Sequence, residues 1–155
     1  MFEHILVPLR LGSADARLIE PALGLARMSQ ADVTLLHVVE KIAGLPGAEL
    51  RRFHEGLAKR ARKTLERHAK AFSREGVPVS ISVLLGEAPA EIVRFAMSHE
   101  VDLIVMGSHC VRAEDDARGW GTTSYKVGLL CQCPVLLVKD LEPAGKARTK
   151  RRRSP

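Results

Sequence analysis

Five apolar runs dominate this chain and alternate with segments of helical periodicity. They run from Ile5 to Leu9, Val33 to Val39, Val79 to Leu85, Val101 to Met106 and Val135 to Val138, and they are rich in Val, Ile and Leu. Continuous apolar runs are typical of strands buried on both faces, whereas strands with one wet face alternate apolar and polar residues. The pattern therefore predicts an α/β fold, in which a five-stranded parallel sheet carries helices on both faces.

Two of the connecting helices can be read directly from the pattern. The longest extends from Glu49 to about Arg74, because apolar residues recur there every three or four positions, and Gly76 ends it. The next has Pro89 near its first position, where a missing N–H costs nothing, and it is expected to bury Ile92 and Ala96.

The first helix is expected to begin after Ser13, whose hydroxyl would cap it. It would then bury Leu18, Ala22 and Leu25. Pro21 either kinks an interior turn or marks a later start, and the sequence leaves that boundary open.

The chain's last two elements are a short helix and a strand. The helix is predicted from Thr122, whose hydroxyl would cap it, to about Leu130, with Val127 and Leu130 facing inward. The strand, Pro134 to Val138, is expected to be a sheet edge. An exposed apolar edge aggregates unless it is covered or paired.

Length and composition favour one domain without disulfides. The chain has 155 residues, the size of a single domain, and its amino terminus carries Glu3 and His4 before a short apolar run. We therefore expect neither a secretion signal nor a membrane span, and a cytoplasmic protein. The three cysteines, Cys110, Cys131 and Cys133, suit neither a disulfide framework nor a paired zinc site, so reduced thiols are expected.

The formal charge of +6 lies in the carboxyl-terminal residues. Residues 146–155 hold six of the 24 lysines and arginines, and without them 18 basic residues stand against 18 acidic ones. Residues 1–145 are therefore formally neutral, and we expect a domain over residues 1–140 followed by a basic, disordered tail over residues 141–155. Such a tail either contacts RNA, DNA or an anionic membrane surface weakly and in a salt-dependent way, or only keeps the chain in solution.

A polar loop bracketed by two glycines lies between the fourth and fifth apolar runs. The fourth run stops at Gly107-Ser108, where the chain is expected to leave the sheet at the carboxyl end of a strand. Gly121-Thr122-Thr123 opens the next helix, and a helix amino terminus offers unpaired N–H groups to a phosphate. Such glycines are also ordinary turn residues, so spacing alone leaves an anion-binding crevice and a plain turn as alternatives.

Several blocks together resemble the universal stress protein family. ILVPLRLGS, VTLLHVV, LIVMGS, GTTSYKV and CPVLLV follow the family's order over residues 2 to about 139. The resemblance implies a Rossmann-like fold of the adenine nucleotide alpha hydrolase type with strand order 3-2-1-4-5. It also implies a stress-response or regulatory protein that forms a homodimer through its last strand. Such a protein acts by binding and is at most a slow ATP hydrolase, for which Asp115 or Asp116 is the available carboxylate.

The resemblance further implies a site for ATP or another adenine nucleotide, with Mg²⁺ accompanying it. In nucleotide-binding members the loop reads Gly, two residues, Gly, nine residues, Gly, then Ser or Thr. Here Gly107 matches the first glycine, Cys110 replaces the second, and Gly121-Thr122 match the last pair after ten intervening residues. The loop is thus similar but altered.

A second departure is Arg10, where nucleotide-binding members usually carry an aspartate near the adenosine. Arginine reverses the charge, so it either occludes the crevice or binds phosphate through its planar fork of donors. The acidic stretch Glu114 to Asp116 opposes a polyphosphate that has no metal. Gly107 and Gly121 therefore favour nucleotide binding, and the altered positions oppose it.

The resemblance and the loop together give nine expected ligand contacts. Gly107, Gly121 and Thr122 would take phosphate, while Leu9 and Val38 would flank the base. The full set is Leu9, Arg10, Val38, Met106, Gly107, Cys110, Gly121, Thr122 and Thr123. The alternative is a nucleotide-independent dimeric interaction module, in which Arg10 fills the crevice and the basic tail recruits a polyanionic partner. No catalytic or metal-binding residues are predicted.

Overall fold

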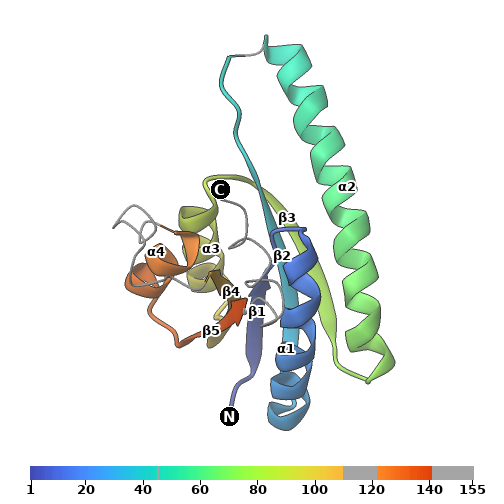
Figure 1. The fold of residues 1–155 in the computed structure, drawn as a ribbon, viewed down its shortest axis with the longest axis vertical. Coiled ribbons are helices and arrows are strands. Elements are labelled where there is room, and N and C mark those ends of the chain that lie inside the picture. Colours follow the sequence, from blue (N-terminus) through green and yellow to red (C-terminus); the bar gives the residue numbers. More distant parts are fainter. Residues whose placement is uncertain (45, 110–121, 141–155) are drawn as a thin grey trace, which may run out of the picture.

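The computed structural model describes residues 1–44, 46–109 and 122–140. Strands and helices alternate along these residues, as Figure 1 shows. In chain order they are β1 (His4–Pro8), the 3₁₀ turn η1 (Ser13–Asp15), α1 (Ala16–Ser29), β2 (Asp32–Glu40), α2 (Gly47–Arg74), β3 (Val79–Gly86), α3 (Ala88–Ser98), β4 (Leu103–His109), α4 (Thr123–Leu130) and β5 (Val135–Asp140).

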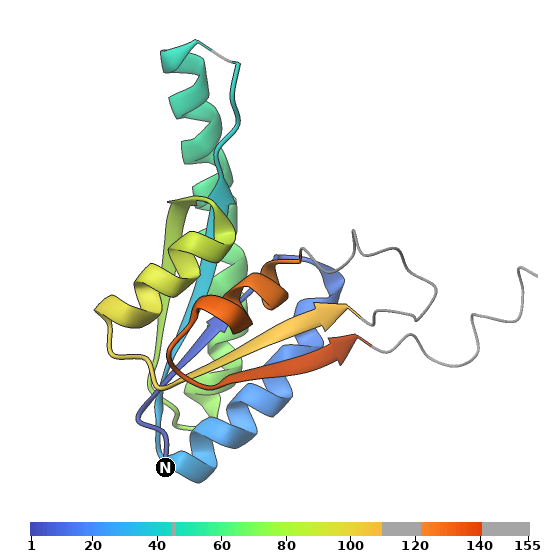
Figure 2. The same ribbon diagram turned by 90° about the vertical axis from the view of Figure 1, so that its left-hand side faces the viewer.

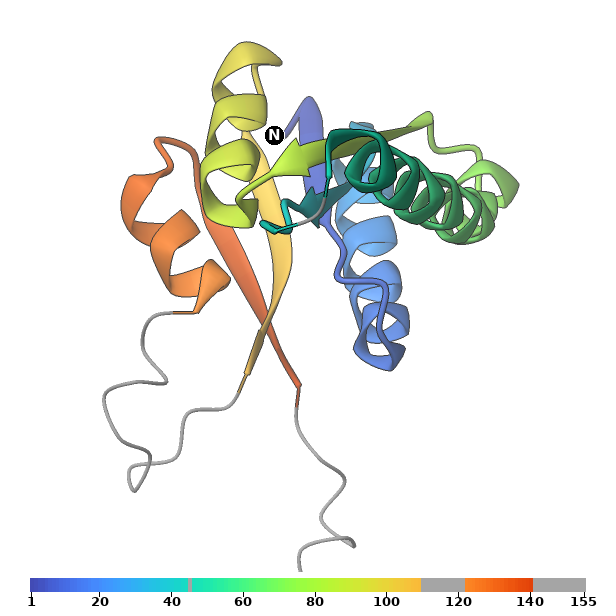
Figure 3. The same ribbon diagram turned by 90° about the horizontal axis from the view of Figure 1, so that it is seen from above.

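The five strands form one parallel sheet in the order β3-β2-β1-β4-β5. Helices α1 and α2 cover one face, and α3 and α4 cover the other, as seen from above in Figure 3. The predicted α/β fold and the 3-2-1-4-5 order are therefore confirmed. From β1 the chain adds β2 and β3 on one side of the sheet, and it then places β4 and β5 on the other side of β1. The strand order therefore reverses between β1 and β4.

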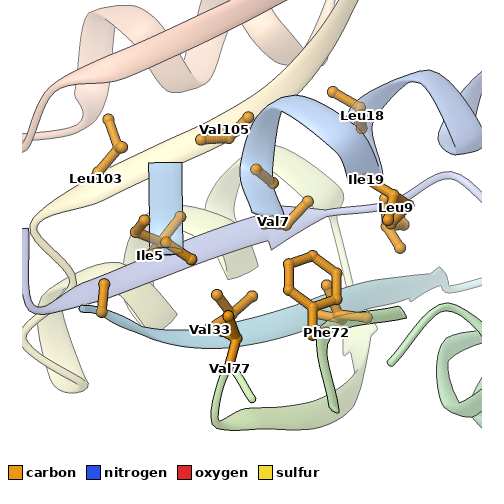
Figure 4. Packing of buried hydrophobic residues seen from close by; sticks show 14 of the residues in the cluster. Ile5, Val7, Leu9, Leu18, Ile19, Val33, Phe72, Val77, Leu103 and Val105 are labelled. Atoms are coloured by element: carbon orange, nitrogen blue, oxygen red, sulfur yellow. The ribbon is translucent and has the colours of Figure 1, made fainter. Parts of the chain in front are cut away.

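The core on the first face joins three strands to α1 and α2. Figure 4 shows Val7 of β1 and Val105 of β4 in the same cluster as Leu18 of α1 and Phe72 of α2. Phe72 is fully buried, and burial of a side chain of this kind contributes about 1.5–3 kcal/mol. The predicted spacing of apolar residues in the long helix thus gives a buried side in its carboxyl-terminal half, at Ala61, Leu65 and Phe72, whereas Phe53 in its amino-terminal half is exposed.

The core on the second face is smaller. Leu6 and Ile104 pack from the sheet against Ile92 and Phe95 of α3, and Val127 of α4 closes the cluster. Alternate residues of one strand thus serve opposite cores, which explains why the strand sequences are continuously apolar.

Strand β4 differs from its prediction at both ends. It continues through His109, because β5 extends to Asp140 and supplies backbone partners, so the prediction that the chain leaves the sheet at Gly107-Ser108 is wrong. It begins at Leu103 and not at Val101. Asp102 instead accepts backbone N–H groups of Glu3 at 2.7 Å and His4 at 3.1 Å, which fixes the entry to β1.

The start of α1 also differs from its prediction. Ser13 lies within η1 and does not cap α1. The residue at the cap position of η1 is Gly12, and no side chain caps this turn. The helix begins at Ala16 and continues through Pro21. Leu25, predicted to be buried, is only half-buried.

The fourth helix confirms one prediction and corrects another. Thr122 caps α4, since its hydroxyl accepts the N–H of Tyr125 at 3.4 Å. Val127 is fully buried, but Leu130 is 61% exposed, so its predicted inward position is wrong. The reason is that α4 ends at Leu130 and the chain turns away, which leaves the last turn uncovered in the described part of the protein.

None of the described helices is both long and apolar enough to span a membrane. The predicted basic tail, residues 141–155, lies outside the described residues. So does most of the glycine-bracketed loop, residues 110–121, including Asp115 and Asp116.

Candidate functional site

A crevice of about 670 Å³ opens at the carboxyl ends of β1, β2 and β4, beside the point where the strand order reverses. Ligands of open α/β sheets bind at such points. Residues 12–15 and the amino termini of α3 and α4 complete the wall. Among the described residues, the lining consists of Pro8, Leu9, Arg10, Gly12, Ser13, Ala14, Asp15, Leu18, Leu36, His37, Val38, Glu40, Ala88, Ile92, Met106, Gly107, Ser108, Thr122 and Thr123.

The structure brings most of the predicted contact residues to this one crevice. The seven that line it are Leu9, Arg10, Val38, Met106, Gly107, Thr122 and Thr123. The other two, Cys110 and Gly121, lie outside the described residues. Leu9, Val38 and Met106 are nearly buried and belong to the two cores, so the crevice wall is a direct extension of the packed interior.

Asp15 fixes the turn that leads out of β1. Asp15 is 3% exposed, and its carboxylate accepts hydrogen bonds from the backbone N–H groups of Arg10 at 3.2 Å and Leu11 at 2.7 Å. Leu11 has a φ of 66°, a left-handed conformation that side chains disfavour. The carboxylate stabilises this turn and thereby positions Arg10 at the crevice. Sequence reasoning missed Asp15, although an aspartate just before a helix is a common signal for such local bonds.

His37 forms the β2 side of the crevice. Its Nδ1 lies 2.8 Å from the backbone oxygen of Leu9. A carbonyl oxygen only accepts, so Nδ1 carries the proton and donates it to this bond. In the neutral ring, Nε2 is then an acceptor. This crevice-lining group was not among the predicted contacts.

The opposite end of the crevice carries hydroxyl groups and a helix amino terminus, and a cation lies next to it. Thr122 and Thr123 line the crevice where α4 begins, and the first turn of a helix favours an anion. Ser108 also lines the crevice, and its hydroxyl accepts a hydrogen bond from the ammonium group of Lys139 at 3.1 Å. Ser108 and Lys139 are partners in the β4–β5 register. Lys139 was not predicted, because it follows the apolar run that marked the last strand.

The crevice combines charges of both signs with an apolar wall. Arg10 and Glu40 line it, the carboxylate of Asp15 is engaged by two N–H groups, and Lys139 adds a positive charge next to the lining residue Ser108. Val38, Ile92 and Met106 supply an apolar wall. A site that combines apolar walls with a few placed polar groups is typical of small-molecule pockets.

A metal site is not part of this geometry as far as the structure describes it. Within residues 1–44, 46–109 and 122–140, no group of three His, Cys, Asp or Glu residues could hold a metal ion.

Cys131 and Cys133 are free thiols, in agreement with the expectation of reduced cysteines. They are half-buried beside the second core, and their sulfur atoms lie 3.5 Å apart. Burial, followed by the hydrogen bond with Cys131, raises the pKa of Cys133 to about 12. Neither residue lines the crevice.

Comparison with known proteins decides the family. The model of the universal stress protein family matches residues 1–139. The chain belongs to the universal stress protein family. Universal stress protein YxiE of Bacillus subtilis is 28% identical over 149 residues, which cover 90% of this chain and 100% of YxiE. A universal stress protein of Thermus aquaticus is 31% identical over 140 residues, again with 90% and 100% coverage.

Solved structures of universal stress proteins share the fold. UspA of Lactobacillus plantarum matches with a TM-score of 0.76 at 23% identity, over 88% of this chain and 97% of its own. A universal stress protein solved in complex with cAMP matches with a TM-score of 0.66 at 17% identity, over 88% of this chain and 96% of its own. A universal stress protein from Archaeoglobus fulgidus, solved in complex with dAMP, matches with a TM-score of 0.62 at 20% identity, over 90% of this chain and 98% of its own.

Proposed function

We propose that this universal stress protein binds an adenine nucleotide in the crevice and acts by binding, without rapid turnover. The observation that carries the proposal is the pairing, in one crevice, of an apolar wall with a helix amino terminus, next to which Lys139 contacts the lining residue Ser108. Solved members of the family in complex with cAMP and dAMP support an adenine nucleotide as the ligand.

The proposal assigns the two ends of the ligand to different elements. The base would lie against Leu9 and Val38, where His37 presents a ring nitrogen. The phosphate would lie toward Gly107 and the start of α4, near Lys139. Mg²⁺ would accompany a di- or triphosphate as its counter-charge, since it lowers the repulsion between phosphate oxygens and nearby carboxylates.

The position of Arg10 supports this proposal over an occluded crevice. Arg10 lines the crevice and is exposed. The crevice keeps its volume of about 670 Å³ with this side chain in place, which is within the range of ligand pockets, roughly 300–1,000 Å³. The side chain therefore leaves room for a nucleotide.

We also propose that the protein is a homodimer in which the β5 edges pair over Pro134 to Val138. Leu136 and Leu137 of β5 are 41% and 37% exposed, and Leu129 and Leu130 of α4 are 68% and 61% exposed. An apolar sheet edge of this kind needs a partner. In sedimentation velocity, Leu136→Lys is expected to shift the protein from dimer to monomer, whereas a dimer that survives the change would place the interface elsewhere.

The nucleotide proposal is tested by isothermal titration of the purified protein with AMP, ADP and ATP, with and without Mg²⁺. Thr123→Glu places a carboxylate where the phosphate is expected, and an acidic residue in the first turn of a helix leaves the helix stable. We expect Thr123→Glu to weaken binding by at least tenfold and the neutral control, Thr123→Gln, by less than threefold. Equal effects of the two variants would place the phosphate elsewhere.

A different result would favour the alternative function. If no nucleotide binds saturably at millimolar concentration, the protein is a nucleotide-independent dimeric interaction module. The altered loop, with Cys110 in place of a glycine, is the observation that keeps this candidate.

A further inference from the structure

Charge is unevenly distributed within residues 1–145, where the formal charges sum to zero. Helix α2 contains nine lysines and arginines and three glutamates. Outside α2 and residues 146–155, nine basic residues stand against fifteen acidic ones. A helix of formal charge +6 is therefore attached to a body of formal charge −6. The whole-chain balance conceals this separation.

Six of the cations on α2 form one line along its outer side. Ala61, Leu65 and Phe72 are buried and define the inner side. At 100° per residue, the six cations fall within an arc of about 100° on the opposite side, and they extend over about 22 Å. We call these residues the basic stripe: Lys59, Arg60, Lys63, Arg67, Lys70 and Arg74.

The basic stripe points to solvent and keeps its charge available. All six residues are exposed. In the described part of the chain, none of the six forms an ion pair; the pair at this end of the fold joins Arg27 to Glu75 instead. Arg67 donates only to the hydroxyl of Thr64, at 3.4 Å. No acidic residue lies within the arc between residues 59 and 74, although Glu66 lies at its margin.

In the described part of the protein, this side of α2 faces solvent. The helix packs on β2 and β3 through its carboxyl-terminal half, and its amino-terminal half extends beyond the rest of the described fold, as Figure 2 shows. None of the basic stripe residues lines the crevice. A partner can therefore approach the whole length of the stripe without contacting the proposed nucleotide site.

We propose that the basic stripe binds the phosphate backbone of duplex nucleic acid without sequence preference. A rigid helix holds the cations in a fixed line, and a duplex presents phosphates at fixed spacing, about one charge per 1.7 Å of its axis. Contacts to phosphate alone carry no sequence information. The proposal stands independently of nucleotide binding in the crevice.

Two other polyanions fit the basic stripe less well. Single strands are held by aromatic side chains on which bases stack, and the stripe contains none. Membrane-surface helices insert an apolar side next to their basic residues. Here that side of α2 is occupied, because Leu65 and Phe72 pack into the core.

The test is fluorescence anisotropy of a labelled 20-base-pair DNA duplex with the full chain, between 25 and 200 mM salt. Arg60→Gln/Arg67→Gln removes two cations of the stripe. Arg51→Gln/Arg62→Gln is the matched control, because it removes two arginines of the same helix that lie outside the arc. Each phosphate contact contributes about 0.9 to the slope of log K against log salt. We expect the stripe variant to lower the slope by about 1.8 and to weaken binding at least fivefold at low salt, with the control within twofold of the parent.

Further arms identify the source of any binding. Arg151→Gln/Arg152→Gln/Arg153→Gln in the full chain reports the contribution of the tail, and phosphatidylglycerol vesicles and single-stranded DNA are competitors. The proposal is overturned if the stripe and control variants behave alike, if only the tail variant loses affinity, or if vesicles or single strands compete better than duplex. Absence of binding at 25 mM salt also overturns it. The substituted side chains are exposed, and circular dichroism checks that each variant is folded.

Discussion

Replacing Asp15 by alanine is expected to destabilise the protein by roughly 3 kcal/mol. The buried carboxylate accepts two backbone N–H groups, from Arg10 at 3.2 Å and Leu11 at 2.7 Å. A hydrogen bond to a charged group contributes about 1.5–3 kcal/mol, and the longer of the two is expected at the lower end. In the alanine variant both N–H groups lose their carboxylate partner, and Leu11 keeps its side-chain packing against the first core to hold its left-handed conformation.

The assay is urea unfolding at pH 7, at one fixed protomer concentration because the protein is proposed to be a dimer. For a domain of this size, roughly 3 kcal/mol corresponds to a fall in Tm of about 6–12 °C. Asp15→Asn keeps one acceptor oxygen and is expected to lose about half as much. Asp32→Ala is the control, since Asp32 is exposed and such changes stay within about 0.5 kcal/mol. If Asp15→Ala were no more harmful than the control, the role of this carboxylate in the β1 turn would be refuted.

Three more outcomes follow from the packing and the thiols. Phe72→Ala, which empties the position of a fully buried ring, is expected to cost about 3–5 kcal/mol in the same urea assay; a loss below 1 kcal/mol would contradict the packing shown in Figure 4. Because burial raises the pKa of Cys133 to about 12 from 9.0, iodoacetamide at pH 8.5 should modify it far more slowly in the folded than in the urea-unfolded protein, as read by peptide mass spectrometry; equal rates would contradict the burial. The sign for stability follows from linkage: the folded thiol keeps its proton above pH 9, so this contribution is present below pH 9 and is lost as the pH rises toward 12. Cys133→Ala should remove that part of the alkaline loss of stability.

The fold was predictable because strands buried on both faces of a parallel sheet are continuously apolar in sequence. Val7 and Leu6 are neighbours in sequence and serve opposite cores, so both positions are apolar. The sequence does not mark the ends of the strands in the same way. Whether β4 stops at Gly107 or continues depends on how far β5 extends beside it, and Lys139 and Asp140 carry no apolar signal.

The crevice was predictable in position but not in its polar detail. Glycines and the strand order indicated Gly107 and Thr122, and both line it. Asp15 was missed because its partners are backbone N–H groups, which every sequence contains. Lys139 was missed because only the β4–β5 register brings it to Ser108.

The net charge of α2 does not appear in a count over the whole chain, because such a count averages the helix with the acidic body. The buried positions of Leu65 and Phe72 show that the cations share the outer side.

The most direct test of the proposed function is a nuclear magnetic resonance titration of the ¹⁵N-labelled protein with AMP. If the nucleotide binds in the crevice, the amide signals of Val38, Gly107 and Thr123 shift saturably and together. The same titration reports on a second hollow at the other end of the sheet, lined by His4 and His99 among others. Shifts confined to that hollow, or no saturable shift at millimolar AMP, would contradict nucleotide binding in the crevice.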